Sequence, residues 1–111
     1  MDKIIINTHE KVSIIDLQDI NYLEAKGAYT IFAIKNGRKA KASKNLNHYS
    51  NLIKNDSLVK IERGLMLNIN NLSEILKESN QSVIVFKDNT ELVLSKPLSL
   101  RLLNIIEEHF I

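Results

Sequence analysis

The stretch 58–71, LVKIERGLMLNINN, constrains the fold more than any other part of the chain. Its first residues alternate as in a β-strand, with Val59 and Ile61 on one side and polar residues on the other. Arg63 and Gly64 interrupt the alternation, which then resumes and ends in asparagines. We therefore expect a strand, a bulge or turn that directs Arg63 outward, and a second strand. A solvated arginine at this corner and an arginine that meets a charged partner are equally good interpretations.

The length of 111 residues is enough for one hydrophobic core, so we expect a single domain over residues 1–111. The absence of cysteine excludes disulfides, thiol catalysis and thiolate metal sites, and it fits a reducing compartment. No apolar run approaches the ~18 residues of a membrane span. The start of the chain also lacks the pattern of a signal peptide. The expected localisation is therefore cytoplasmic.

Short segments rich in β-branched and aromatic residues recur along the chain, separated by turn signals. The clearest signal is Asn36-Gly37, the dipeptide most typical of a two-residue hairpin. Segment 20–25 is predicted to be a further strand, preceded by a helical turn with Asp16 as its N-cap. Segment 72–76 fits a short helix or a strand equally well. The predicted hairpins pair 3–7 with 12–15, 29–34 with 38–42, and 83–86 with 91–94.

Two segments have the apolar spacing of helices. The first is expected to begin at Ser43, as its cap, and to run to about Lys54, with a buried stripe that includes Leu46 and Tyr49. The second follows Pro97, a residue well placed in the first turn of a helix. Strands outnumber helices and hairpins join them, so the expected class is mainly β with antiparallel sheets.

The distribution of charge is more informative than the net charge of +2. Residues 25–44 hold six basic side chains and no acidic one. Such a field can steer an anionic polymer toward the chain. The competing interpretation is a lysine-rich edge hairpin that only keeps the sheet in solution. The six residues are Lys26, Lys35, Arg38, Lys39, Lys41 and Lys44.

Motifs of catalysis are absent from the sequence. It has no glycine-rich phosphate loop, no HExxH and no GxSxG. His9, His48 and His109 fall in unrelated elements, which argues against a shared metal site. We therefore expect neither an enzyme nor a bound cofactor or metal.

Four segments, taken in order, resemble the LytTR-type DNA-binding domain of bacterial response regulators. They are 15–25 (IDLQDINYLEA), the strand at 29–34 with its Asn36-Gly37 turn, 43–52 with Asn45-Leu46, and 58–68 (LVKIERGLMLN). Each segment is short, but their common order and spacing make the resemblance specific. It extends from about Lys3 to Ile106.

The resemblance implies an elongated β-β-β arrangement of small antiparallel sheets with one central helix and a C-terminal helix. It also implies sequence-specific binding of duplex DNA by loops between strands, as the output domain of a bacterial transcriptional regulator. Such loops enter successive major grooves, and two copies side by side on paired direct repeats are the implied arrangement. Family members usually follow a receiver or a membrane segment, and this sequence contains neither. The chain is therefore expected to be an excised domain, or to act alone or with a partner.

Carried over by position, the resemblance assigns DNA contacts to four places along the chain. Base reading is assigned to Arg63, because its forked guanidinium can hold guanine O6 and N7 together. Arg101 is a weaker candidate. The full set is Lys26, Tyr29 and Thr30 in the first loop, Ser43 and Lys44 at the helix start, Lys60 and Arg63 in the central stretch, and Ser95 and Lys96 in the last loop.

Three positions depart from the family pattern. Glu62 stands where histidine is usual, Gly64 replaces a serine, and Pro97 replaces an arginine. A carboxylate repels phosphates unless it pairs with Arg63 or Lys60, or reads a cytosine amino group. These departures bear on the affinity and the sequence preference of DNA binding.

The competing hypothesis is a small β-rich module that binds another protein through strand edges and does not bind DNA. The two hypotheses differ in whether the six basic residues and Arg63 share one face with Lys96. Single-stranded nucleic acid ranks last as a ligand, because it needs aromatic stacking platforms. Most of the six aromatic residues of this chain are expected to be buried.

Overall fold

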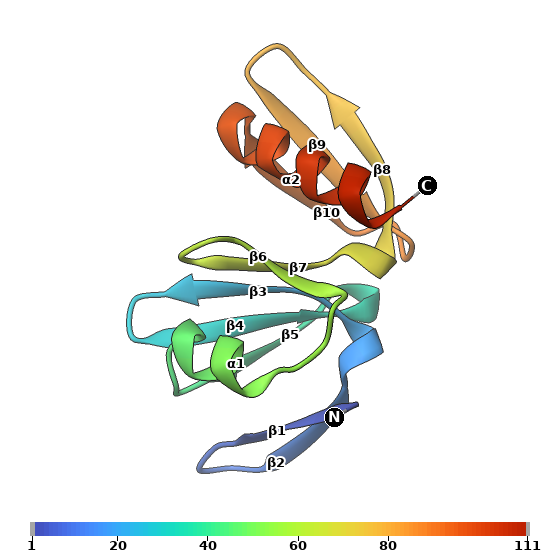
Figure 1. Cartoon of the computed structure of the whole chain (residues 1–111). Coiled ribbons are helices and arrows are strands. Elements are labelled where there is room, and N and C mark those ends of the chain that lie inside the picture. Colours follow the sequence, from blue (N-terminus) through green and yellow to red (C-terminus); the bar gives the residue numbers. More distant parts are fainter. Residues whose placement is uncertain (1, 111) are drawn as a thin grey trace.

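The computed structural model describes residues 2–110 as three antiparallel sheets arranged along one long axis (Figure 1). The described chain measures 43 × 28 × 25 Å along its principal axes, so the domain is elongated. This architecture confirms the predicted fold class. The strands are β1 Lys3–Asn7, β2 Val12–Asp16, β3 Ile20–Lys26, β4 Tyr29–Ile34, β5 Arg38–Ala42, β6 Leu58–Glu62, β7 Leu65–Asn68, β8 Leu72–Lys77, β9 Gln81–Phe86 and β10 Glu91–Ser95, and the α-helices are α1 Leu46–Leu52 and α2 Lys96–His109.

The central sheet has five strands in the order β5-β4-β3-β7-β6. Strand β3 lies at its middle and pairs with β4 on one side and β7 on the other. The β1–β2 hairpin and the β10-β9-β8 sheet lie toward the two ends of the long axis (Figure 1). The stretch 58–71 spans β6, a turn at Arg63-Gly64 and β7, as its alternation predicts.

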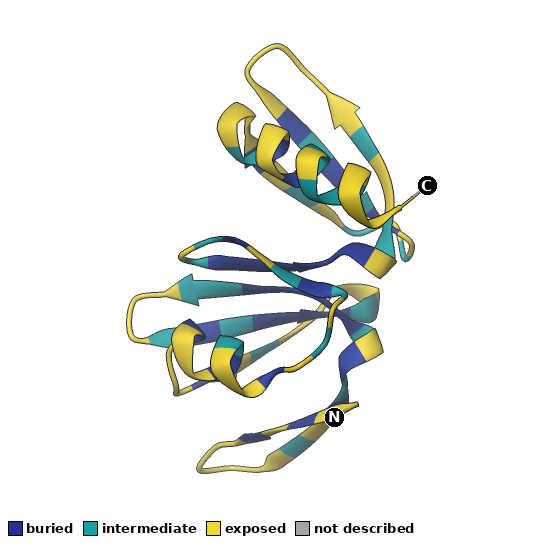
Figure 2. Cartoon of the chain, in the orientation of Figure 1, coloured by how far each residue is buried: buried dark blue, intermediate teal, exposed yellow. Residues whose placement is uncertain are grey.

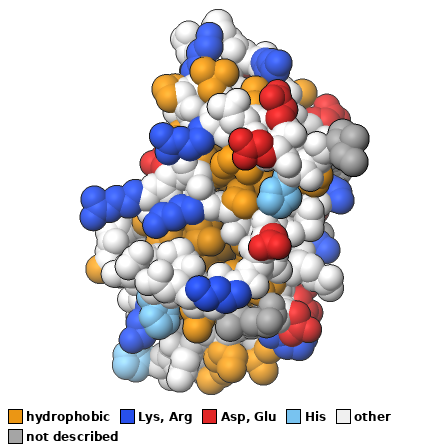
Figure 3. All heavy atoms as spheres, viewed as in Figure 1, with side chains coloured by type: hydrophobic (Ala, Val, Ile, Leu, Met, Phe, Trp, Pro, Cys, Tyr) orange, Lys and Arg blue, Asp and Glu red, His pale blue; other side chains and the backbone are white. Residues whose placement is uncertain are grey.

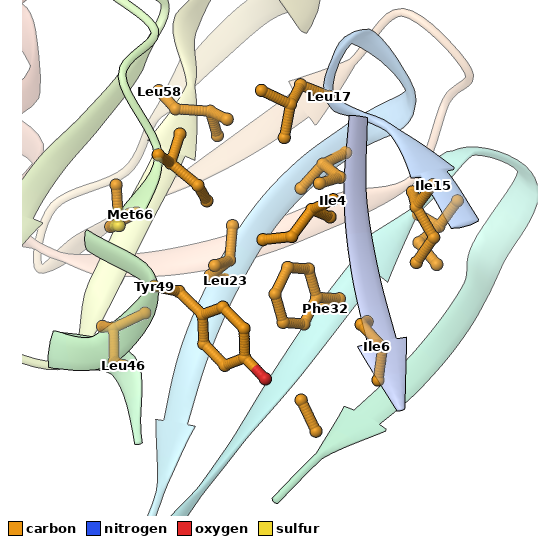
Figure 4. Close-up of a cluster of buried hydrophobic side chains, with 14 residues drawn as sticks. Ile4, Ile6, Ile15, Leu17, Leu23, Phe32, Leu46, Tyr49, Leu58 and Met66 are labelled. Atoms are coloured by element: carbon orange, nitrogen blue, oxygen red, sulfur yellow. The ribbon is translucent and has the colours of Figure 1, made fainter. Parts of the chain in front are cut away.

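One hydrophobic core fills the space between the central sheet, the β1–β2 hairpin and α1 (Figure 4). Phe32 of β4 is fully buried and meets the ring of Tyr49 of α1 edge to face, with 4.9 Å between centroids. Ile4 and Ile6 of β1 pack against the same cluster. Because strand side chains alternate, the intervening Ile5 is left exposed on the outer face of the hairpin. The hairpin accordingly shows both buried and exposed residues in Figure 2.

A second core lies on the opposite face of the central sheet, under the three-stranded sheet and α2. Leu67 of β7, Phe86 of β9 and Leu102 of α2 are fully buried in it. The ring of Tyr22 of β3 stacks on Phe86 with 5.9 Å between centroids. The central sheet is therefore covered on both faces, which explains why residues 20–23 of β3 are all buried.

A cluster of amide side chains joins the central sheet to the three-stranded sheet. Asn21 donates to Asp88 Oδ2 at 3.2 Å and to Thr90 Oγ1 at 3.1 Å, and Asn71 donates to Asn21 Oδ1 at 3.2 Å. Asp88 Oδ2 also accepts from the backbone N–H of Asn36 at 2.7 Å. Partial burial by itself raises the pKa of the Asp88 carboxyl, but the hydrogen bonds from Thr90, Asn36 and Asn21 outweigh it and lower that pKa below its ordinary value.

The prediction for the start of the central helix is wrong by a few residues. Helix α1 begins at Leu46, and Asn45 is its cap, since Asn45 Oδ1 accepts from the backbone N–H of His48 at 3.0 Å. Ser43 lies outside the helix. The buried stripe through Leu46 and Tyr49 is confirmed.

Two further details refine the sequence-based account. A 3-10 turn follows Asp16 as predicted, but the Asp16 side chain makes an ion pair with Lys3 and does not cap the turn. The ambiguous segment 72–76 is a strand, β8, which forms an edge of the three-stranded sheet.

Acid should weaken the junction between the two sheets. Because the pKa of Asp88 is lower in the folded protein than the ordinary value of 3.8, its carboxylate stabilises the fold fully above that value. This contribution is lost as the pH falls through the folded-state pKa. In urea titrations from about pH 6 to about pH 2.5, we expect the free energy of unfolding to fall less steeply below pH 4 in Asp88→Asn than in the wild type. Asp56→Asn, which removes an exposed carboxylate, should keep the wild-type slope. Equal slopes in all three proteins would contradict the role of Asp88.

Candidate nucleic-acid interface

Three segments that are far apart in sequence meet at one end of the central sheet (Figure 1). They are the β3–β4 turn at 26–29, the segment 43–45 between β5 and α1, and the β6–β7 turn at Arg63-Gly64. The backbone N–H of Ala25 donates to the carbonyl of Gly64 at 2.9 Å, which holds the two turns together. The segment 43–45 arrives at the same end because Thr30 of β4 pairs with Ala42 of β5.

These segments surround an open hollow of about 640 Å³. Lys60 and Arg63 line it from the β6–β7 hairpin, and both are exposed. Asn45, Asn47 and Gly27 line the remaining walls. A guanidinium, an ammonium and two carboxamides therefore border one concave surface, and these are groups that can contact phosphates and base edges.

The two turn glycines, Gly27 and Gly64, differ in whether their backbone conformation would accept another residue. Gly27 has a φ of +62°, in the left-handed region where other residues are strained. Gly64 is not among the positive-φ glycines, and a Cβ at this position would meet the Ala25 Cβ at 3.5 Å, an ordinary contact. The β6–β7 turn therefore has room for the serine that the family pattern places there.

Neighbouring side chains hold the basic residues of the first loop. The Lys41 ammonium lies 4.1 Å from the centroid of the Tyr29 ring, a cation–π contact that links β5 to the β3–β4 turn. Lys26 Nζ lies 3.6 Å from Glu24 Oε1, so part of its charge is offset within the loop. Tyr29 is half-buried, whereas Lys26 and Lys41 are exposed.

Thr30 is the one predicted site residue whose side chain the structure places in the interior. It is 0% exposed, and its Oγ1 donates to the backbone carbonyl of Lys44 at 2.9 Å. The side chains of Ser43 and Lys44 are exposed on the segment that this bond holds. The side chain of Thr30 is therefore not at the surface of this end, and its hydroxyl anchors the 43–45 segment.

Sequence reasoning missed the β1–β2 turn as a neighbour of this surface. Asn7, Thr8 and His9 line a second hollow together with Lys41 and Ser43. His9 is exposed there, although its sequence context indicates only a turn residue. No local signal in the sequence could reveal this contact, because it depends on how the hairpin packs across the core.

The start of α2 lies on the same side of the molecule as the β3–β4 and β6–β7 turns (Figure 1). Ser95 caps α2 by accepting from the backbone N–H of Leu98 at 3.5 Å, and Lys96 is exposed beside it. Pro97 occupies the first turn of the helix, as predicted. Arg101 donates from Nη1 to the backbone carbonyl of Ile61 at 2.7 Å, so it joins α2 to β6.

The six basic residues of 25–44 do not share one face with Lys96, and this criterion by itself favours the protein-binding alternative over DNA. Lys26, Lys41 and Lys44 lie at the end with the hollow, whereas Lys35 pairs with Asp19 at 3.3 Å. Arg38 and Lys39 line a different hollow, together with Lys11. Several Lys and Arg side chains gather on the left of the space-filling view, the side on which the turns lie (Figure 3).

Residues 2–110 contain no group of three or more His, Cys, Asp or Glu side chains that could hold a metal ion. Within the same range, no helix is long and apolar enough to cross a membrane.

Comparisons with known proteins agree with this geometry. The family model of the LytTr DNA-binding domain matches residues 10–107. The solved LytTr DNA-binding domain of a methyl-accepting/DNA response regulator from Bacillus cereus is similar to this chain with a TM-score of 0.76. The two chains are 15% identical, and the alignment covers 96% of this chain and 97% of the other, a likeness that concerns the fold. A search of curated proteins finds no match.

Removing the Thr30 hydroxyl should loosen the 43–45 segment. Thr30→Val keeps the shape of the side chain but leaves the carbonyl of Lys44 without its buried donor. We expect the free energy of unfolding to fall by about 0.5–1.5 kcal/mol. Hydrogen exchange should quicken in residues 43–45 and stay unchanged in β9. Ser43→Ala, which removes an exposed hydroxyl, is the matched control and should behave as the wild type. A Thr30→Val protein with wild-type exchange at 43–45 would argue against this anchor.

Proposed function

Because the chain belongs to the LytTR family of DNA-binding domains, we propose that it binds duplex DNA sequence-specifically, as the output domain of a bacterial transcriptional regulator. DNA binding without catalysis is what membership of this family implies. The observation that carries the finer proposal is the convergence of three loops around Arg63. Loops at the end of a sheet can enter a groove without a recognition helix, and their positions are fixed here by the pairing of the strands.

In this proposal some residues of the loops contact bases and others contact phosphates. Arg63 reads a guanine from the exposed turn, since a forked guanidinium can hold O6 and N7 together. Lys26, Lys44 and Lys60 contact phosphates, which position the domain but carry no sequence information. Tyr29 and Ser43 lie at the same end of the sheet and contact the sugar–phosphate backbone of the DNA. Thr30 contributes indirectly, through the Lys44 carbonyl.

A second contact region at the start of α2 extends the proposed interface along the DNA. Ser95 and Lys96 lie on the same side as the turns but belong to the three-stranded sheet and its helix. The long dimension of the domain, 43 Å, exceeds the ~34 Å of one turn of B-DNA. The whole domain can therefore span about one turn of the duplex, whereas the bond from Arg101 of α2 to Ile61 keeps Lys96 closer to Arg63 than that length. Two copies on paired direct repeats would extend this pattern along the duplex.

The departures from the family pattern concern two of these contacts. Glu62 is half-buried next to Arg63 and places a carboxylate beside the proposed base-reading group. Such a carboxylate can select cytosine through its amino group, or reduce affinity by repelling phosphates. At the second region, Pro97 fits the first turn of α2, and Lys96 supplies positive charge there without the arginine of the family pattern.

Arg63 and Lys44 should differ in what their loss does to binding. We expect Arg63→Ala to weaken binding to a selected duplex by ~1–3 kcal/mol and to relax the base preference at one position. Lys44→Ala should weaken cognate and random DNA alike and reduce the slope of log affinity against log salt by about 1. Fluorescence anisotropy on duplexes selected from genomic fragments, at two salt concentrations, measures both effects. Lys87→Ala removes an exposed lysine from the β9–β10 turn and serves as the control. Equal losses on cognate and random DNA for Arg63→Ala would refute its role in base reading.

Gly64→Ser should restore the hydroxyl that the family pattern places in the β6–β7 turn. The backbone at Gly64 accepts a side chain, because a Cβ there makes only an ordinary contact with Ala25. We expect unchanged or slightly higher stability and an affinity for duplex DNA that rises by about 0.5–1.5 kcal/mol, the value of one added hydrogen bond. Gly27→Ser is the contrasting variant, since a φ of +62° should make it destabilising. Gly64→Ser with normal stability and no gain in anisotropy-measured affinity would show that this turn does not face DNA.

A further inference from the structure

The outer face of the three-stranded sheet is apolar and acidic. Val93 of β10 pairs with Val83 of β9, which in turn pairs with Leu76 of β8, so three aliphatic side chains form a row across the sheet. In the next row Val85 lies between Glu91 and Glu74. Val93 is 55% exposed and Leu76 is 45% exposed, because α2 covers only the opposite face. We call this surface the acidic face; its residues are Glu74, Leu76, Val83, Val85, Glu91 and Val93.

The opposite end of the molecule carries an apolar surface with the opposite charge. Ile5 of β1 pairs with Ile14 of β2 on the outer face of the hairpin, and with Val12 they are 58–67% exposed. Ile14 also lines a hollow with three cations from the β1–β2 turn and β5. We call this surface the basic end; its residues are Ile5, Lys11, Val12, Ile14, Arg38 and Lys39.

The charges of these two surfaces are free to act on a partner. The two acids that line the hollow of the basic end, Asp16 and Asp19, already pair with Lys3 and Lys35, and Glu10 is a further exposed acid in the β1–β2 turn. Within residues 2–110, no ion pair involves Lys11, Arg38 or Lys39, or the glutamates of the acidic face. The acidic face therefore keeps both negative charges and the basic end keeps three positive ones.

Charge decides which occupant fits the acidic face. Duplex DNA is excluded by the two carboxylates, Glu74 and Glu91. Two acidic faces pressed together would bring four carboxylates into contact without a counter-charge, which excludes a two-fold dimer through this surface. The matching chemistry, aliphatic side chains flanked by cations, is present on the basic end of the same chain.

We propose that the acidic face of one copy docks on the basic end of a second copy, head to tail. The aliphatic row of Leu76, Val83 and Val93 covers Ile5 and Ile14, while Glu74 and Glu91 meet the cations at the rim. The contact is heterologous, so it leaves one free surface at each end and can add further copies in one direction. Because only a few aliphatic side chains meet on each side, we expect a weak interface, of the class that buries less than roughly 1,200 Å² in total. The contact does not depend on DNA binding.

Sedimentation velocity of the full chain without DNA tests the contact. Over a concentration series up to about 1 mM, we expect the weight-average sedimentation coefficient of the wild type to rise, and to rise less in high salt. Glu74→Lys/Glu91→Lys gives two basic surfaces and Arg38→Glu/Lys39→Glu gives two acidic ones. Each variant alone should associate at least ~tenfold more weakly. An equimolar mixture of the two should recover wild-type association within about threefold, which also shows that both variants are folded.

The control is Glu107→Lys/Glu108→Lys, which reverses the same number of exposed charges on α2 and should sediment as the wild type. A wild type that stays monomeric to about 1 mM would overturn the proposal. The proposal would also be overturned if the two folded variants did not associate with each other in the mixture. It would likewise be overturned if either charge-reversed variant alone associated as strongly as the wild type. Anisotropy on a duplex with one site separates this contact from DNA binding, because Glu74→Lys/Glu91→Lys should bind that duplex as tightly as the wild type or more tightly.

Discussion

The hydrogen-bonded pairing of β3 with its two neighbours is the constraint on which the rest of the structure depends. Strand β3 is central in the five-stranded sheet and buried on both faces, so neither face can move without opening a core. Its pairing with β7 continues into the bond from Ala25 to Gly64, which holds two surface turns side by side. The pairing of the strands therefore fixes the positions of the loops at the candidate site. The loops do not need many contacts among themselves to stay in place. This is the arrangement expected where a rigid scaffold positions binding loops.

Most of the fold could be predicted from the sequence, because each hairpin has its own local pattern of alternating strand residues and turn residues. The alternation in 58–71 predicts β6, the turn and β7, and Asn36 indeed takes the left-handed φ of 68° that an Asn-Gly turn favours. The start of α1 was misplaced because Ser43 and Asn45 are both good caps, and only the packing of Leu46 decides between them. The direction of the Asp16 side chain likewise depends on Lys3, thirteen residues away, which no local pattern reveals.

The candidate site was less predictable than the fold, for a geometric reason. A run of basic residues in sequence becomes a patch only if the chain brings it to one place. Strands β4 and β5 form a hairpin that rises ~3.3 Å per residue, so Lys35 and Arg38 at its turn lie far from Lys44, which follows β5, and from Lys26, which pairs with Tyr29 at the start of β4. The burial of Thr30 could not be predicted for the same kind of reason, since it follows from pairing with Ala42 and from the carbonyl of Lys44. Arg63 could be singled out because its exposure is set locally, by a turn.

The bond from Arg101 to Ile61 has a consequence for the edge of the central sheet. Strand β6 is an outer strand of the central sheet, and such strands offer unpaired carbonyls to any other strand that approaches. The guanidinium of Arg101 donates a hydrogen bond to the Ile61 carbonyl, and helix α2 packs beside β6. At this point of the edge, a further strand would have to displace the arginine to pair with β6. The arginine thus covers one backbone acceptor at an outer strand of the central sheet.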